Sequence, residues 1–367
     1  MNLKLRNTVL LALALFVYSA CDMEIESLEL HKPFEYDEQY YENLRAYKES
    51  DHCIFFGWFA AYAPLEGVGG YKDPASWGER ILGLPDSVDI ISFWMGVPGN
   101  DPNDPDSYAP IAYADWKFVR EKKGTRFVAT TITRIRGKHI RLNDGTDYVV
   151  PSNATATQIS ANDYKMCIDY AQMLVEQADR SGVDGIDIDY EPEGDPLTGT
   201  PFTRFVQHIA QFYGPTSGTG KLLTIDYWSS TPPAACGPLV DYYIRQAYTQ
   251  GVNHNSESRM QGFYNTVSSA LGNNPRKFIV TEQMSVWAEN GGSPWHKTQD
   301  DGTQMISPTD GANMYSLEGM ARWNPTQGKK GGFGGFYFCR DYGNKNGPYY
   351  NVRKSIQAAN PAAHMNK

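Results

Sequence analysis

The feature that most limits how this chain can fold is a regular alternation of short apolar, β-rich runs with helical stretches from Asp51 onward. Eight such runs can be counted: Cys53–Phe59, Val88–Met95, Arg126–Ile132, Gly185–Tyr190, Leu222–Trp228, Tyr242–Tyr248, Lys277–Glu282 and Gly334–Phe338. Helical stretches such as Asn162–Ser181 and Thr203–Tyr213 lie between most of them. Eight strand–helix units predict an α/β fold, a single-domain (β/α)8 TIM barrel over residues 51–362.

A doubly wound open sheet is the alternative architecture, but no Gly-rich phosphate loop follows the first run, which weakens it. Long irregular segments follow several strands, and in a barrel these segments surround the C-terminal mouth, where active sites lie. They are residues 60–77, 96–110, 134–158, 191–203, 229–238 and 283–311.

The most informative stretch is Asp184–Glu191, which reads Asp-Gly-Ile-Asp-Ile-Asp-Tyr-Glu. Side chains alternate across a strand, so Asp187, Asp189 and Glu191 share one face at intervals of about 6.6 Å. Like charges at close range push pKa values apart, and we expect an ionised acid low in this ladder with protonated partners above it. A protonated Glu191 at the barrel mouth is what a general acid requires.

Two other interpretations of this ladder are a metal site and a structural polar core. Mg²⁺ and Ca²⁺ need convergent oxygens, whereas these three carboxylates follow one line. A structural core rarely holds three carboxylates with no Arg or Lys between them. We therefore favour catalysis and expect no metal.

The stretch, at the end of the fourth predicted strand, resembles the Asp-Gly-x-Asp-x-Asp-x-Glu signature of glycoside hydrolase family 18. All five defining positions are filled, with Asp184 and Gly185 as the structural part of the motif. The family contains chitinases and the endo-β-N-acetylglucosaminidases that trim N-glycans. The resemblance implies a retaining, substrate-assisted hydrolase with Glu191 as acid and base, Asp189 holding the substrate acetamide, and Asp187 sharing a proton with Asp189.

Other segments decide between the branches of the family. Gln246-Ala247-Tyr248 resembles the family's Met/Gln-x-Tyr segment, which implies that Tyr248 donates to the acetamido oxygen and that Gln246 contacts substrate. The chitinase Ser-x-Gly-Gly segment is replaced by Thr130–Thr133, and no Trp lies in the eighth run. These departures favour the endo-β-N-acetylglucosaminidase branch, with an N-glycan or another N-acetylglucosamine-containing glycan as substrate and no cofactor.

Aromatic residues make up 13% of the chain, and Tyr and Trp suit surfaces that stack on sugar faces. The candidate substrate-binding aromatics near strand ends are Trp58, Trp94, Trp228 and Tyr337, and those in the long loops are Tyr108, Trp287 and Trp295. Packing inside a large barrel is the alternative for each of them.

Residues 1–21 resemble a bacterial lipoprotein signal peptide, with Lys4 and Arg6 before the apolar stretch Val9–Val17 and with Ser19-Ala20 directly before Cys21. This predicts lipidation at Cys21 and an outer-membrane lipoprotein; an ordinary secretory signal is the alternative. The acidic cluster Asp22–Glu26 resembles the surface-export signal of Bacteroidetes lipoproteins and predicts exposure on the cell surface, although a solvated acidic linker has the same composition. Residues 22–50 are predicted to form a tether and one helix, Asp37–Glu49.

The remaining composition narrows the partners. A formal net charge of −9 with no basic run argues against nucleic acid. Cys53, Cys167, Cys236 and Cys339 are too dispersed for a zinc cluster and are predicted to be free, with Cys53 and Cys339 in buried strands. We expect a monomer. A catalytically silent glycan-binding lipoprotein and a chitinase remain alternative functions, whereas a lyase or esterase lacks a matching constellation of residues.

Overall fold

The computed structural model describes residues 36–63, 72–141, 145–249 and 252–361. The predicted signal peptide, the predicted lipidation site Cys21 and the acidic cluster behind it lie outside these described residues. Within them, no helix combines the length and the apolar character needed to cross a membrane.

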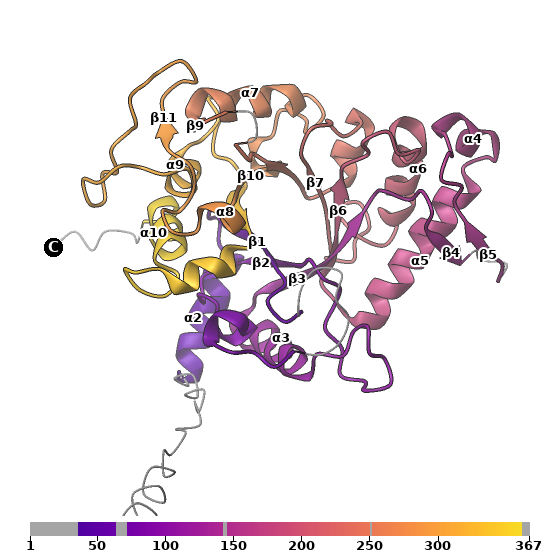
Figure 1. Cartoon of the computed structure of the whole chain (residues 1–367), viewed down its shortest axis with the longest axis horizontal. Helices are drawn as coiled ribbons and strands as arrows, with labels where there is room; N and C mark the ends of the chain where they lie inside the picture. The colour runs from indigo at the N-terminus through magenta and orange to yellow at the C-terminus, as the bar shows by residue number, and fades with distance from the viewer. Residues whose placement is uncertain (1–35, 64–71, 142–144, 250–251, 362–367) are drawn as a thin grey trace, which may run out of the picture. The chain divides into compact units, whose positions relative to one another are not determined.

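Eight parallel strands close into a barrel at the centre of the domain (Figure 1), and the predicted (β/α)8 fold is confirmed. The strands are β1 (Ile54–Phe59), β2 (Ile90–Phe93), β3 (Arg126–Ile132), β6 (Gly185–Tyr190), β7 (Leu222–Tyr227), β8 (Tyr242–Gln246), β10 (Phe278–Gln283) and β12 (Gly332–Phe336). Each predicted run contains one of them or overlaps it, and β3 and β6 have the predicted bounds. Neighbours in the chain are neighbours in the barrel, and β12 pairs with β1 to close it.

Helices surround the strands. They are α2 (Glu38–Glu49), α3 (Pro110–Lys123), α4 (Ala156–Ala161), α5 (Lys165–Ser181), α6 (Gly199–Ile209), α7 (Glu257–Val267), α8 (Met284–Trp287), α9 (Ser316–Arg322) and α10 (Tyr350–Ala359). The 3₁₀ helices are η1 (Trp77–Glu79), η2 (Ile81–Gly83), η3 (Ala234–Leu239), η4 (Pro275–Lys277) and η5 (Phe338–Gly343). In the described residues, the connections that follow β1 and β7 contain only 3₁₀ turns.

Several of the predicted irregular segments carry secondary structure; residues 191–203 contain the start of α6, and residues 229–238 contain most of η3. Residues 134–158 contain a hairpin of β4 (His139–Arg141) and β5 (Asp147–Val149), which lies beside α5 (Figure 1), and the start of α4. Residues 283–311 contain α8 and β11 (Trp295–His296), which pairs with β9 (Asn255–Ser256). Strands this short give no periodic signal, so sequence patterns could not identify them.

The four cysteines of the described domain are free, as predicted. The predicted strand positions of two of them are wrong: Cys53 lies directly before β1, and Cys339 lies in η5.

The barrel interior changes from apolar to polar along its axis. A compact apolar group that includes Ile90, Val128, Leu222 and Ile279 fills the lower part. Above it, the inward positions of the same strands carry Ser92, Thr130, Asp187, Asp189, Thr224, Asp226 and Thr281, all buried except the half-buried Thr130. The outward positions, such as Ile186 and Ile188, pack against the helices.

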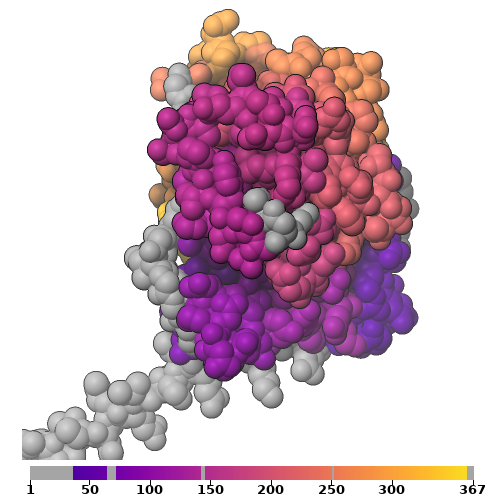
Figure 2. All heavy atoms as spheres, turned by 90° about the vertical axis from the view of Figure 1, so that its right-hand side faces the viewer, coloured from indigo at the N-terminus to yellow at the C-terminus, as the bar shows by residue number. Residues whose placement is uncertain are grey.

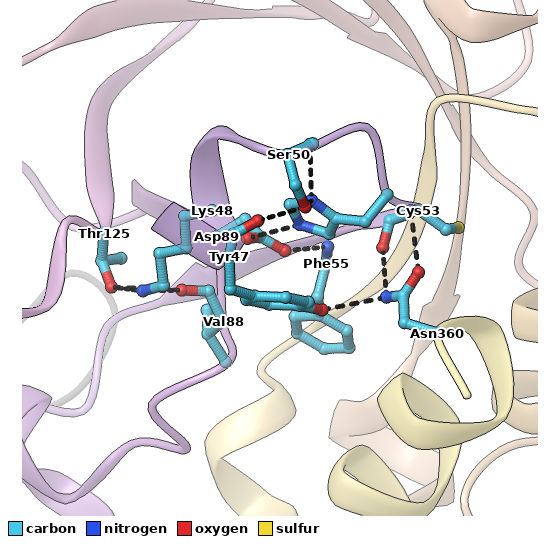
Figure 3. A network of polar contacts seen from close by, with 10 residues as sticks. Tyr47, Lys48, Ser50, Cys53, Phe55, Val88, Asp89, Thr125 and Asn360 are labelled. Atoms are coloured by element: carbon cyan, nitrogen blue, oxygen red, sulfur yellow. Dashed lines mark hydrogen bonds and ion pairs between the residues drawn. The ribbon is translucent and has the colours of Figure 1, made fainter. Parts of the chain in front are cut away.

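A polar network closes the opposite, N-terminal end of the barrel and attaches α2 to it (Figure 3). Asp89 accepts hydrogen bonds from His52 Nε2 at 2.9 Å and from the Phe55 backbone N–H at 2.8 Å. Lys48, on α2, donates to the Val88 carbonyl at 2.8 Å and to the Thr125 hydroxyl at 2.5 Å. The carboxylate at this end therefore has a basic partner and a backbone donor.

Candidate active site

The acid ladder lies on β6, as the alternation of its side chains predicts. At the foot of the strand, Asp184 accepts from Arg120 Nε at 2.8 Å and from the Phe127 backbone N–H at 2.9 Å, so it fixes the register of β3 and β6. Gly185 has no room for a side chain, because a Cβ there would lie 2.5 Å from the Leu222 carbonyl oxygen and 2.8 Å from Val128. The motif's first two residues therefore set the packing that holds the strand.

Asp187 is fully buried and well supplied with donors. Trp58 Nε1 and the Ser92 hydroxyl donate to its Oδ2 at 3.0 and 2.8 Å, and the Thr224 hydroxyl donates to its Oδ1 at 2.6 Å. Burial raises the pKa of Asp187 to about 6, and these hydrogen bonds limit the rise. Asp187 is thus the acid in the ladder that is best suited to carry a negative charge.

A fourth acid, Asp226 on β7, lies beside the ladder. Its backbone is in register with Asp189, and both side chains point into the barrel. Gln246 Nε2, from β8, donates to Oδ1 of Asp226 at 2.5 Å and to Oδ1 of Asp189 at 3.3 Å. Asp226 was not among the predicted site residues, although the inward alternation from Leu222 through Thr224 could have indicated it.

Glu191 stands at the top of the ladder, where the strand opens into the mouth, and its side chain is 18% exposed. Arg134 Nη2 lies 2.6 Å from Glu191 Oε2 and 3.1 Å from Glu193 Oε2, and Arg134 Nε donates to the Glu191 carbonyl. The loop that carries Arg134 is fixed because Asp195 accepts the backbone N–H groups of Ile135 and Arg136 at 2.8 and 3.0 Å. Arg134 was also missed, since nothing in its local sequence distinguishes it.

Burial dominates the electrostatics of the cluster, and the cation Arg134 at the mouth lowers the pKa values of Asp189 and Glu191 without cancelling the effect of burial. Burial and then the charges of Asp189 and Asp187 raise the pKa of Asp226 far above the ordinary value. Burial, followed by the charge of Glu191, raises the pKa of Asp189. Burial also raises the pKa of Glu191, and the charge of Arg134 opposes that rise. The cluster therefore retains protons that isolated acids would lose at neutral pH.

Tyr248 lies at the mouth just beyond β8 and is 8% exposed. Burial and then the charges of Asp226 and Asp189 raise the pKa of its phenol, so it remains a hydrogen-bond donor at neutral pH. Arg259 Nη2 donates to the Tyr248 carbonyl at 2.9 Å and fixes its backbone.

An aromatic wall faces the acids. The ring centroid of Phe336, at the end of β12, lies close to those of four other aromatic residues. The centroid distances are 5.1 Å to Trp94, 6.2 Å to Trp58, 6.3 Å to Tyr248 and 4.3 Å to Tyr337. Phe336 thus takes the central place at the eighth strand, where the sequence showed no Trp, and it was not among the predicted sugar contacts.

The structure corrects the roles predicted for two residues. Trp58 is 1% exposed and donates to Asp187, so it supports the ladder and is not a sugar platform. Trp295 is fully packed against Gly319 of α9 and cannot serve as a stacking surface. Gln246 uses its amide N–H to hold Asp189 and Asp226, so it orients these acids, and its contact with substrate stays a prediction.

The other predicted aromatics retain some exposure. Trp94, Trp228, Tyr337, Tyr108 and Trp287 are all half-buried. Trp94 lines a hollow of about 550 Å³ that runs from Thr130 past Ile132 toward His139 and α5. Figure 2 looks onto a face that is hollowed between purple and magenta parts of the chain. Tyr337 lines a second hollow of about 470 Å³, and Met95 contributes to both.

Comparison with known families gives one match that spans most of the chain. The profile described as "Glycoside hydrolase family 18, BT1044-like" matches residues 20–358. Among curated proteins, the chain is similar to endo-β-N-acetylglucosaminidase F2 of Elizabethkingia meningoseptica, with 26% identity over 313 residues, 82% of this chain and 77% of that protein.

Solved structures agree on the fold. A structure of BT1044 superposes with a TM-score of 0.65 at 23% identity and covers 88% of this chain and 93% of its own. The endo-β-N-acetylglucosaminidase of Cordyceps militaris, in complex with fucosyl-N-acetylglucosamine-Asn, superposes with a TM-score of 0.60 at 21% identity, over 89% of this chain and 98% of its own.

Proposed function

The chain belongs to glycoside hydrolase family 18, and we propose that it is a retaining endo-β-N-acetylglucosaminidase that cleaves the β-1,4 bond of the di-N-acetylchitobiose core of N-glycans. The position of Glu191 carries the proposal. Its carboxyl lies at the mouth above the buried acids Asp187 and Asp189, is partly exposed, and has a raised pKa. A carboxyl with a raised pKa holds its proton more firmly than an ordinary glutamate, and a general acid needs such a proton for the leaving group.

In the proposed reaction, Glu191 gives its proton to the glycosidic oxygen while the bond to the anomeric carbon breaks. The carbonyl oxygen of the 2-acetamido group attacks that carbon and forms an oxazolinium ion. Ionised Asp189 accepts the acetamido N–H and stabilises the positive charge, and Tyr248 donates to the acetamido oxygen. Water then attacks the anomeric carbon, the bond between that carbon and the acetamido oxygen breaks, and the water gives a proton to Glu191, so that the 2-acetamido group and the acid are restored and the configuration is retained.

The choice of an N-glycan over chitin rests on the shape of the site and on the curated relative. The Ser-x-Gly-Gly segment is absent, and Phe336 occupies the eighth-strand position. Two hollows meet at Met95 beside Trp94 and Tyr337, and because their linings contain none of the acids of the ladder, they are candidates for seating the arms of a branched glycan rather than the cleaved bond. The similar curated protein is an endo-β-N-acetylglucosaminidase.

The proposal is tested by comparing initial rates on a glycopeptide with one N-glycan and on chitotetraose. We expect release of the glycan with one N-acetylglucosamine left on the peptide, a β-anomeric first product by NMR, and a slower rate on chitotetraose. A chitotetraose rate equal to the best glycopeptide rate would make the protein a chitinase. Glycan binding with no release from high-mannose, hybrid or complex glycopeptides would make it a binding protein.

The proposal includes a location. The sequence around Cys21 supports a lipoprotein anchored to the outer membrane and facing outward, where N-glycans of other organisms are accessible. Stable anchoring takes more than one acyl chain. We expect Cys21→Ala to move the protein out of the membrane fraction and external protease to digest the wild type on intact cells. Retention of Cys21→Ala in membranes, or protection of the wild type, would contradict the anchor or the orientation respectively.

A further inference from the structure

The hydrogen bonds around the buried acids are distributed unequally. Asp187 accepts three side-chain donors on its two oxygens. Asp226, equally buried, accepts one, from Gln246 to Oδ1, and its Oδ2 receives no hydrogen bond from any of the described residues. A buried carboxylate oxygen without a donor is costly, whereas a carboxylic acid can use the same atom as an O–H donor. This distribution places a proton on Oδ2 of Asp226.

The acceptor for that proton is adjacent. Asp226 and Asp189 are register partners on β7 and β6, their side chains share the barrel interior, and Gln246 Nε2 donates to one oxygen of each. Two ionised carboxylates in this position would repel each other with no cation between them. One proton shared as Asp226 O–H to Asp189 removes the repulsion and supplies Asp189 with a second donor besides Gln246.

We propose that Asp226 is a positioning residue that remains protonated and donates to Asp189, which keeps Asp189 ionised and oriented toward the substrate acetamide. This inference rests on the proposed function for its catalytic consequence, but not for the location of the proton. It assigns to Asp226 the proton-sharing role that the motif alone implies for Asp187, because Asp187 is already satisfied by Trp58, Ser92 and Thr224.

The surrounding groups agree with this assignment. The ionisable groups around Asp226 are Asp187 and Asp189 on β6 and Tyr248 beyond β8, and Glu191 acts on it through Asp189. All are acidic, and the nearby cation, Arg134, pairs with Glu191 and Glu193 at the mouth. Burial, followed by the charges of Asp189 and Asp187, raises the pKa of Asp226. The charge of Glu191 raises the pKa of Asp189, and this contribution disappears when Glu191 carries the proton that it needs for catalysis.

Two substitutions separate a protonated Asp226 from an ionised one. In Asp226→Asn, the amide oxygen accepts from Gln246 and the amide N–H donates to Asp189, as a protonated acid would. We expect kcat within about threefold of wild type and an unmoved acidic limb of the pH profile. Asp226→Val removes the donor, so the pKa of Asp189 rises; we expect the acidic limb to move to higher pH and kcat to fall by about 10- to 100-fold, the scale of one to two pKa units.

An infrared difference spectrum between wild type and Asp226→Asn at neutral pH tests the proton directly and needs no activity. The proposal predicts loss of a protonated-carboxyl C=O band, and loss of a carboxylate band instead would overturn it. A fall of more than tenfold in kcat for Asp226→Asn, with a native melting curve, would overturn it as well. Wild-type protein without glycosidase activity would contradict the proposed function, while the infrared result would still decide where the proton resides. Should Asp226→Val fail to fold, the Asn variant alone decides.

Discussion

Buried or half-buried acids occur at both ends of this barrel, and their partners differ. At the N-terminal end, Asp89 pairs with His52 and a backbone N–H, and Asp184 pairs with Arg120 (Figure 3 shows the Asp89 network). At the mouth, Asp187, Asp189 and Asp226 are satisfied by hydroxyl, indole and amide groups or by one another. Acids with basic partners fix the structure, whereas acids that share protons with each other remain available for chemistry.

The largest difference should appear in activity. Asp189→Asn removes the charge that stabilises the oxazolinium, and we expect kcat to fall by about 10²–10³-fold, the usual range for loss of one preorganised electrostatic group. Because Asp189 is buried beside other acids, its neutralisation should leave the free energy of unfolding unchanged or higher. Steady-state kinetics and urea unfolding of the same sample measure both. If Asp189→Asn lost activity only because it unfolds, Asp189 would be a structural acid like those at the N-terminal end, which would contradict the comparison.

At the N-terminal end of the barrel, loss of an acid is expected to lower stability. Asp89→Ala leaves His52 and the Phe55 backbone N–H without their acceptor, and breaking a buried pair should lower the free energy of unfolding by about 3–5 kcal/mol. Asp51→Ala is the matched control, because Asp51 is 77% exposed and pairs with Arg276 at the surface, where a salt bridge contributes at most about 1 kcal/mol. Equal effects of the two substitutions would show that the polar network around Asp89 contributes little to stability.

Arg134 is an exception to this difference between the two ends, because it is a basic partner for an acid at the mouth. Burial raises the pKa of Glu191 and Arg134 lowers it, so Arg134→Gln should raise that pKa further. The basic limb of the kcat/KM profile reports loss of the acid's proton and should move upward by less than about one pH unit. Arg141→Gln, which removes an exposed arginine from the β4–β5 hairpin, is the control and should leave the limb in place. A basic limb that stayed in place or moved to lower pH would contradict this effect of Arg134 on the pKa of Glu191.

The smallest predicted effect is a pH dependence of stability that arises at the N-terminal end of the barrel. Burial opposes the charge on His52, but Asp89 outweighs it and raises the pKa of His52 above 6.5. The folded protein then binds this proton more tightly than the unfolded chain, so the stabilisation is complete below pH 6.5 and is lost as the pH rises through the folded pKa. The difference in unfolding free energy between wild type and His52→Gln should therefore shrink as the pH rises through this window. A difference that grows with pH would reverse the assignment.

The sequence predicted the barrel and the ladder because both depend on local periodicity. Alternation within β6 places Asp187, Asp189 and Glu191 on one face without knowledge of any other strand. Asp226 and Arg134 come from other segments, and their contacts depend on strand register and on loop paths that a single sequence does not encode in a readable pattern. For the same reason Trp58 and Trp295 were predicted to contact sugar, since an aromatic side chain gives no signal that separates a stacking surface from a buried support.

The most direct test of the account is a single comparison of wild type with Glu191→Gln, measuring turnover and binding of one N-glycopeptide. Gln keeps the shape of the side chain but has no proton to give to the leaving group or to take from water. We predict that turnover falls by at least about 10²–10⁴-fold, the contribution of general acid–base catalysis, while the dissociation constant stays within about threefold of wild type. Turnover within threefold of wild type would contradict the assignment of Glu191 and, with it, the view that the acids at the mouth perform the chemistry.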